Sequence, residues 1–152
     1  MVMMLTSLGF DSGGRLAERC TCDGEDASPP LAWSGVPAGT RSLALVCLDP
    51  DAPSGTWYHW AVYDLAPNLT ELAGHQLTTG GALRQAINDF GKPGYGSVCP
   101  PSGHGLHHYR FRLYALTAER LELPPRPGCR DVERAAEAHA LARADLVGTY
   151  SR

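Results

Sequence analysis

Residues 42–54, Ser-Leu-Ala-Leu-Val-Cys-Leu-Asp-Pro-Asp-Ala-Pro-Ser, set the expectation for the fold. The first half of this stretch is a short apolar run, and the second half is rich in proline, which cannot continue a regular strand or helix. A short apolar run that ends at such a cluster is typical of a buried strand. Because each proline restricts the residue before it to extended backbone, the strand should be followed by a stiff turn that presents Asp49 and Asp51.

Two later segments are also predicted to be strands, Trp57–Leu65 and Tyr109–Leu116, and the second should place alternate apolar side chains on one face. Near the C-terminus the pattern changes from alternation to steps of three and four residues. The repeating positions are Ala135, Ala138, Ala142 and Leu146. Asp131 can cap a helix here and Gly148 can end it, so we expect a sheet with one long C-terminal helix over residues 131–148.

The composition is that of an ordinary globular protein. The chain has 152 residues, of which 43% are hydrophobic and 19% are charged, and one domain spanning residues 1–152 is expected. A formal net charge of −3 gives no basic surface of the kind that nucleic-acid binding requires. No apolar stretch reaches transmembrane length and no basic amphipathic segment occurs, so stable insertion into a membrane is not expected.

The five cysteines are an odd number, and a reduced, cytoplasmic protein is the simplest interpretation. Cys99 is then expected to be a small buried thiol. Three histidines lie close together in the sequence, at His104, His107 and His108, but their spacing is unlike that of common zinc sites. We therefore predict no metal site and no cofactor.

The turn after the first strand and the aromatic segment that follows it are the first two candidates for a ligand site. Asp49 and Asp51 lie in the turn, although aspartates in such turns often only accept hydrogen bonds from backbone amides. His59 lies in the aromatic segment and should share a face with Trp57, opposite both of its immediate neighbours. A packed histidine with a satisfied ring nitrogen is the alternative interpretation of His59.

Residues 94–109 form the third candidate. Their glycines allow a ligand to approach the backbone closely, and successive backbone amides can form a concave anion site. The segment ends on the third predicted strand, where alternation places His107 and Tyr109 on one face and His108 on the other. No Gly-x-Ser-x-Gly motif is present, so a serine nucleophile is not expected.

In their order along the chain, these segments resemble the motifs of the phosphatidylethanolamine-binding protein family, in particular its bacterial branch of Raf-kinase-inhibitor-like proteins. The motifs are Asp49-Pro-Asp-Ala-Pro53, His59-Trp60, Gly94-Tyr95-Gly96, Pro100-Pro101 and Gly105-Leu-His-His-Tyr109. Other segments agree as well, so the resemblance covers nearly the whole chain. It implies a mostly β fold, an antiparallel β-sandwich with peripheral helices, and a small pocket that accepts phosphate-like anions.

The ligand site that the motifs and the resemblance predict consists of Asp49, Asp51, His59, Gly96, His107 and Tyr109. Gly96 matches the glycine that lines the floor of the family's pocket. Ser97 and Val98 stand where bacterial relatives commonly have a glycine and a proline, and His108 stands where an arginine is common. The rim of the pocket should therefore differ in shape and have less positive charge.

The predicted function is the binding of a small anion such as phosphate, a phosphoethanolamine-like group or a carboxylate. His59 and His107 should donate N–H bonds, Tyr109 an O–H bond, and Asp49 should accept a proton. An aspartate beside an anion is unfavourable unless one of the groups is protonated, so affinity should rise as pH falls through the histidine range.

Two other functions stay open at this point. The family name suggests a regulator or inhibitor of a kinase or protease that acts through protein contact. A hydrolase that uses the aspartate, histidines and tyrosine of the pocket is the second alternative, although no activated nucleophile or catalytic residue is assigned. The resemblance also implies self-association as a homodimer.

Overall fold

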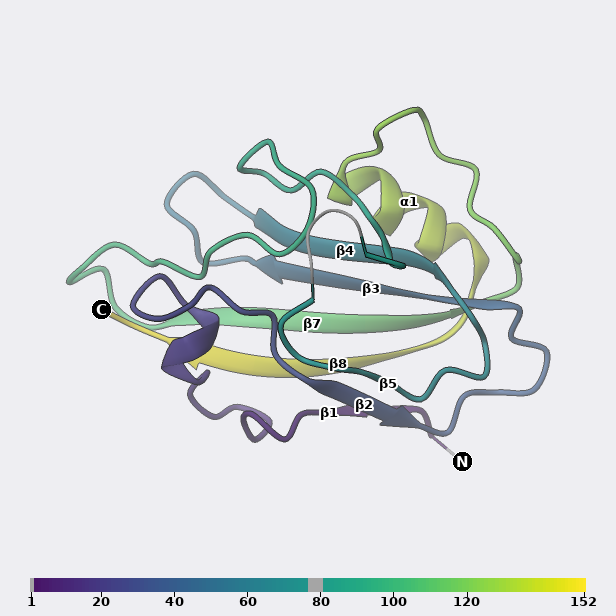
Figure 1. Ribbon diagram of the computed structural model, residues 1–152, viewed down its shortest axis with the longest axis horizontal. Helices are drawn as coiled ribbons and strands as arrows, with labels where there is room; N and C mark the ends of the chain where they lie inside the picture. Colours follow the sequence, from purple (N-terminus) through teal and green to yellow (C-terminus); the bar gives the residue numbers. More distant parts are fainter. Residues whose placement is uncertain (1, 77–80) are drawn as a thin grey trace.

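The computed structural model describes residues 2–76 and 81–152, and β-strands form most of its regular structure (Figure 1). The elements are β1 (Met4–Thr6), the 3-10 helix η1 (Glu18–Cys20), β2 (Leu31–Ser34), β3 (Ser42–Asp49), β4 (Trp57–Leu65), β5 (Glu71–Leu72), β6 (Arg84–Gln85), β7 (His107–Leu116), α1 (Cys129–His139) and β8 (Ala140–Tyr150).

These strands form two antiparallel sheets. The larger sheet has the strand order β6-β4-β3-β7-β8, and the smaller sheet has the order β1-β2-β5. In Figure 1 the smaller sheet lies on one side of the larger sheet and α1 lies on the other side. The predicted antiparallel β-sandwich with a helix near the C-terminus is therefore confirmed.

Strand β3 lies at the centre of the larger sheet, and all of its side chains are buried. Leu43, Leu45 and Cys47 pack into the core between the two sheets, while Ala44 and Val46 pack into a second core beneath α1. Because both faces of this strand are covered, its sequence is continuously apolar and does not alternate with polar residues. The predicted strand at residues 42–48 is thus confirmed, with one further residue at its end.

The alternation predicted for the third strand is also confirmed. Four side chains of β7 lie in the core between the sheets: Tyr109, Phe111, Leu113 and Ala115. The strand begins two residues before the predicted start, at His107, so that both residues of the predicted histidine–tyrosine pair lie on a regular strand.

The predicted C-terminal helix is wrong in its second half. Helix α1 ends at His139, and residues 140–150 instead form β8, which pairs with β7 along its whole length. Asp131 is not the N-cap but lies in the first turn, where its carboxylate accepts a hydrogen bond from the backbone N–H of Gly128 at 2.8 Å. Alanine fits both a helix and a strand, so the three- and four-residue spacing of the alanines between 135 and 142 did not show where the helix ends. From residue 140 onward, hydrogen bonding to the edge of β7 favours a strand.

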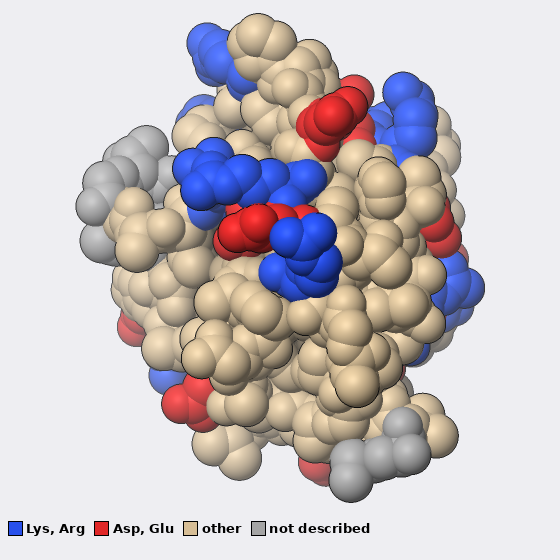
Figure 2. Space-filling model, turned by 90° about the vertical axis from the view of Figure 1, so that its right-hand side faces the viewer, with Lys and Arg blue, Asp and Glu red and all other residues tan. Residues whose placement is uncertain are grey.

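Most of the face that Figure 2 shows is uncharged, and side chains of both signs lie next to one another near its centre. Ion pairs in the described part of the chain include Arg41 with Glu119 at 3.2 Å and Arg112 with Asp145 at 2.9 Å. Among the helices of the described residues, none has the length and apolar character needed to cross a bilayer.

Candidate functional site

A cavity of about 270 Å³ lies where the C-terminal end of β3 meets the N-terminal parts of β4 and β7. Four predicted site residues line it together: Asp49, His59, His107 and Tyr109. They converge because β3 runs antiparallel to both of its neighbours, so that its last residue lies beside their first residues. The other walls are mainly apolar, formed by Trp57, Phe90, Pro53, Pro100 and Pro101.

Asp49 and His107 form a buried hydrogen-bonded pair in this cavity. Nδ1 of His107 lies 2.7 Å from Oδ2 of Asp49, and both side chains are almost fully buried. A carboxylate can only accept, so Nδ1 donates and the proton position of the neutral ring is fixed. The other carboxylate oxygen of Asp49 accepts a hydrogen bond from the backbone N–H of Asp51 at 2.8 Å, which orients the carboxylate.

His59 is placed by a β-bulge. Cys47 lies opposite Trp60 and Leu48 lies opposite Tyr58, so His59 is the extra residue on β4. The prediction that His59 shares a face with Trp57 holds, since both line the cavity, but Trp60 is not opposite to it and packs in the core between the sheets. Because of the bulge, side chains on β4 do not alternate strictly between the two faces of the sheet at this point. Residue spacing alone did not indicate this.

The role expected for His59 as a donor to the ligand also needs correction. Nδ1 of His59 donates to the carbonyl oxygen of Gly96 at 3.1 Å, and burial lowers the pKa of the ring. The ring is therefore neutral near physiological pH, and its Nε2 presents a lone pair. In that state His59 can accept a hydrogen bond from a ligand and cannot donate one.

Gly96 supports the cavity and does not line it. Its N–H donates to the carbonyl of His59 at 2.7 Å, in addition to its carbonyl accepting from the His59 ring, so the two residues hold each other. A Cβ on Gly96 would lie 2.6 Å from the ring of Phe90, which is too close for any side chain to fit without movement. The glycine thus allows Phe90 to pack beside His59.

Tyr109 directs a polar group into the site. Burial, and secondarily the negative charge of Asp49, raise the pKa of its hydroxyl, which therefore stays protonated. Within the described part of the chain, no residue forms a hydrogen bond with this hydroxyl. Its ring stacks on that of His107 with the centroids 6.3 Å apart. Tyr109 can thus donate a hydrogen bond to a ligand.

Asp51 lies outside the cavity lining. Its carboxylate accepts hydrogen bonds from the backbone N–H and from Nδ1 of His108, at 2.9 and 2.8 Å. Partial burial would raise the pKa of Asp51, but these hydrogen bonds outweigh that effect and lower it. Asp51 therefore fastens the turn to β7, which is the structural role considered as the alternative for this turn.

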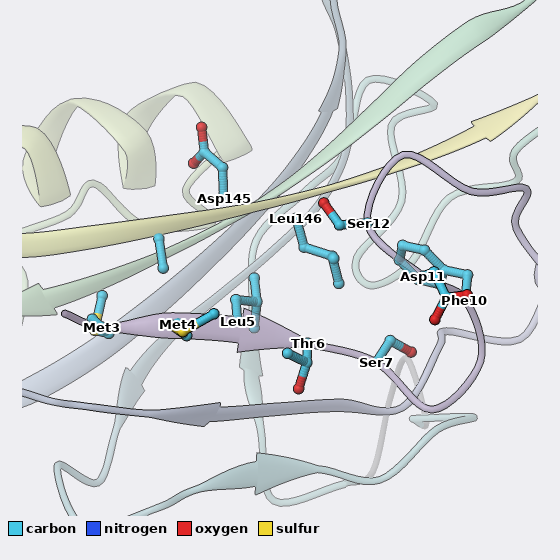
Figure 3. A pocket seen from close by; sticks show the side chains of 11 residues that line it. Met3, Met4, Leu5, Thr6, Ser7, Phe10, Asp11, Ser12, Asp145 and Leu146 are labelled. Carbon is cyan, nitrogen blue, oxygen red and sulfur yellow. The ribbon is translucent and has the colours of Figure 1, made fainter. Parts of the chain in front are cut away.

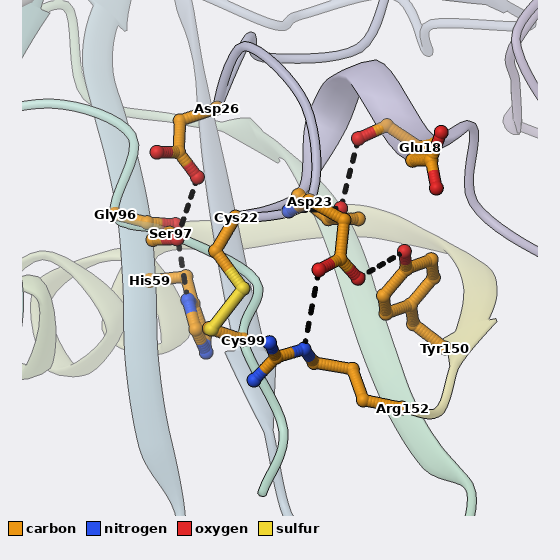
Figure 4. Close-up of a disulfide and its surroundings, with 11 residues drawn as sticks. Glu18, Cys22, Asp23, Asp26, His59, Gly96, Ser97, Cys99, Tyr150 and Arg152 are labelled. Atoms are coloured by element: carbon orange, nitrogen blue, oxygen red, sulfur yellow. Dashed lines mark hydrogen bonds and ion pairs between the residues drawn. A yellow bond between two sulfur atoms is a disulfide. The ribbon is translucent and has the colours of Figure 1, made fainter. Parts of the chain in front are cut away.

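A disulfide between Cys22 and Cys99 forms one side of the site (Figure 4). The prediction that all five cysteines are reduced is wrong for this pair, and Cys99, which lines the cavity, is exposed and not buried. The other three cysteines are buried thiols. Nothing in the local spacing of the cysteines indicated a link across a sequence separation of 77 residues.

The unusual Ser97 and Val98 both hold the disulfide-linked loop in place. Oγ of Ser97 donates to Oδ1 of Asp26 at 2.5 Å, and the carbonyl of Val98 accepts from the N–H of Cys22 at 3.0 Å. Ser97 also lines the cavity, whereas Val98 is fully buried in the core between the sheets. The rim is therefore tied to the loop that contains Cys22 and Asp26.

One feature of the site was missed in the sequence. His104, considered only as a metal ligand, places its Nδ1 2.7 Å from Nε2 of His107. Its position between Gly103 and Gly105, in a loop free to bend toward the site, was the feature of the sequence that could have indicated this contact. Among the described residues that line the cavity there is no lysine or arginine, so positive charge in the lining can come only from histidine.

Another hollow, of about 340 Å³, lies between β1 and β8 (Figure 3). Its lining is largely apolar, with Met3, Leu5 and Leu146 among the side chains that point into it. The carboxylate of Asp145 at its edge is already paired with Arg112. None of the predicted site residues contributes to this hollow.

Comparison with known proteins assigns this arrangement to a family. The family model described as phosphatidylethanolamine-binding protein matches residues 6–151. The chain belongs to the phosphatidylethanolamine-binding protein family. The match covers almost the whole of this chain, which confirms the resemblance seen in the motifs.

Among these family members, an Aquifex aeolicus protein named UPF0098 protein is 43% identical over 99% of this chain and 90% of its own length. A UPF0098 protein of Methanothermobacter thermautotrophicus is 46% identical over 99% of both chains. The crystal structure of Escherichia coli YbcL, described as a new member of the mammalian PEBP family, is 32% identical and superposes with a TM-score of 0.92, covering 100% of this chain and 99% of that chain.

Proposed function

We propose that this protein binds a small oxyanion, such as phosphate, a phosphoethanolamine-like head group or a carboxylate, in the cavity between Asp49, His107 and Tyr109. The observation that supports this most directly is the Tyr109 hydroxyl, which is protonated, lines the cavity and has no partner in the described part of the chain. A hydroxyl that faces the cavity and has no protein partner can donate to an anion without breaking an existing hydrogen bond within the protein, so a ligand that accepts its hydrogen bond is favoured.

The apolar walls strengthen any hydrogen bond made at the bottom of the cavity. Trp57 and Phe90 pack edge to face with their centroids 5.3 Å apart, and the prolines opposite contribute no N–H groups. Such surroundings have a low effective dielectric constant, in which a hydrogen bond to a charged oxygen is stronger than in water. They also penalise a net charge, so the anion needs compensating protons.

Compensation can come only from the histidines or from the anion itself, because the described lining contains no lysine or arginine. His59 is held neutral by burial, which leaves the Asp49–His107 pair as the place where an additional proton can be held. Affinity for an oxyanion should therefore rise as pH falls through the range in which histidines titrate.

We favour binding over hydrolysis because no histidine of the cavity is positioned to activate a serine or cysteine nucleophile among the described residues. Ser97, which lines the cavity, donates to Asp26 and not to a histidine. Within the described residues, neither His59 nor His107 forms a hydrogen bond with a serine or with a cysteine thiol. A nucleophile with a dedicated base is therefore not part of the proposal.

Isothermal titration calorimetry with inorganic phosphate and with phosphoethanolamine tests the proposal. His107→Ala should weaken phosphate binding by at least about ten-fold, because it removes a hydrogen bond to a charged group. The exposed His139, on the last turn of α1, offers the matched control His139→Ala, which should bind as the wild type does. Equal affinity in all three proteins, or affinity that does not change with pH, would contradict the proposal.

A further inference from the structure

Both ring nitrogens of His107 are already engaged. Nδ1 donates to Asp49, and Nε2 lies 2.7 Å from Nδ1 of His104, with the two rings 4.9 Å apart between centroids. Because Asp49 holds Nδ1, any anion that accepts a hydrogen bond from His107 must do so at Nε2. His104 occupies that nitrogen.

We propose that His104 competes with the anion for Nε2 of His107, so that binding of an oxyanion displaces the His104 ring. This inference rests on the proposed function and adds to it a residue that sets the affinity of the site. His104 is not part of the cavity lining, so its effect acts through His107.

The two partners of His107 are anchored very differently. Asp49 is the last residue of the buried central strand, and its second oxygen is held by a backbone N–H. His104 is exposed on a loop between Gly103 and Gly105, whose φ angles are +76° and +100°. A Cβ on either glycine would meet nothing within 4 Å, so the loop around His104 is not enclosed by packing.

Displacing His104 therefore costs little, whereas displacing Asp49 would open the core. The backbone N–H of His104 donates to the carbonyl of Pro101 at 3.1 Å, and that of Gly103 to the carbonyl of Arg152 at 2.9 Å. Both bonds involve the backbone and remain when only the His104 ring rotates away. The ring itself gives up one hydrogen bond, and as an exposed side chain it exchanges that bond for one with water.

The distance between the two nitrogens also limits what His107 can do while His104 is in place. Two ring nitrogens at 2.7 Å share one proton between them, so His107 has no N–H to spare for a ligand. A proton for the new hydrogen bond enters either with the anion or at the Asp49–His107 pair. In both cases Nε2 has to be released by His104 before the anion can use it.

The test is the affinity for inorganic phosphate, measured by calorimetry in the wild type, His104→Ala and the control His139→Ala. His104→Ala should tighten phosphate binding by about three- to ten-fold, the equivalent of removing one competing hydrogen bond. The control should leave it unchanged. Weaker or unaltered binding by His104→Ala overturns the inference, because His104 would then help the ligand or have no effect on it.

Nitrogen NMR of the imidazole rings separates this inference from the proposed function. In the free protein, the chemical shifts should show His104 and His107 sharing a hydrogen bond, and phosphate should return those of His104 to the values of a free ring. If His107→Ala abolishes phosphate binding but the His104 resonances do not respond to phosphate, only the inference fails. If phosphate binds neither the wild type nor His104→Ala, the proposed function fails and the inference fails with it.

Discussion

His59 shows how a single buried ring can set a pH dependence for the whole fold. Burial lowers the pKa of His59 in the folded protein, while in the unfolded chain the ring has its ordinary value. As pH falls, the unfolded state therefore takes up a proton first, and the free energy of unfolding decreases. The stability due to the neutral ring is present above the unfolded pKa and is lost as pH falls toward the folded one.

Urea unfolding at a series of pH values measures this effect. The free energy of unfolding of the wild type should decrease below about pH 6.5, and His59→Asn, whose amide nitrogen takes the place of Nδ1 and can still donate to Gly96, should show a shallower decrease. His75→Asn is a suitable control, because His75 is exposed and has a φ of +60°, which asparagine tolerates. An equal slope in His59→Asn and the wild type would show that His59 is not the group responsible.

At the scale of residues, the sequence indicated which side chains converge but not how their protons are arranged. Asp49, His59, His107 and Tyr109 could be predicted because strand ends and family motifs both point to them. The hydrogen bond from His59 to the Gly96 carbonyl could not, because it depends on a bulge and on a loop that crosses beside it. The same holds for His104, whose contact with His107 is set by the path of the loop.

At the scale of elements, β8 shows where periodicity fails. Its apolar residues also fit a helical pattern, and the helix was predicted through Gly148 because glycine commonly ends helices. In the structure Gly148 lies inside the strand for a packing reason: a Cβ there would be 2.7 Å from the side chain of the buried Leu16. The pairing of β8 with β7 and the contact of Gly148 with Leu16 join residues far apart in the sequence, so local spacing could not reveal that residues 140–150 form a strand.

Gly148→Val tests this explanation. The added side chain should overpack the contact with Leu16 and lower the free energy of unfolding by roughly 1–3 kcal/mol, measured by urea denaturation. Leu141→Val, at an exposed position of the same strand, should have little effect. The double variant with Leu16→Ala should recover part of the loss, since the smaller side chain makes room for valine. A simple sum of the two single losses would argue against direct contact.

At the scale of the whole molecule, the N-terminal third is fastened to the cavity end of the sandwich. The disulfide joins Cys22 to Cys99, Ser97 bonds Asp26, and the hydroxyl of Tyr150 at the end of β8 donates to Asp23 at 2.7 Å (Figure 4). A cytoplasmic location was expected because the cysteines were expected to be reduced. The disulfide means that this argument no longer applies, since stable disulfides are rare in reducing compartments. Oxidation of this pair should therefore contribute to stability and to the shape of the cavity wall.

Thiol counting and unfolding together test this contribution. Without reductant the denatured chain should show three free thiols, those of the buried Cys20, Cys47 and Cys129. Opening the long loop that Cys22 and Cys99 close should lower the free energy of unfolding by about 2–4 kcal/mol, because the unfolded chain gains conformational freedom. A reductant can reach the exposed Cys99, so it should destabilise the wild type and leave the double variant Cys22→Ser, Cys99→Ser unaffected. Five reactive thiols in the denatured, unreduced chain would rule the disulfide out.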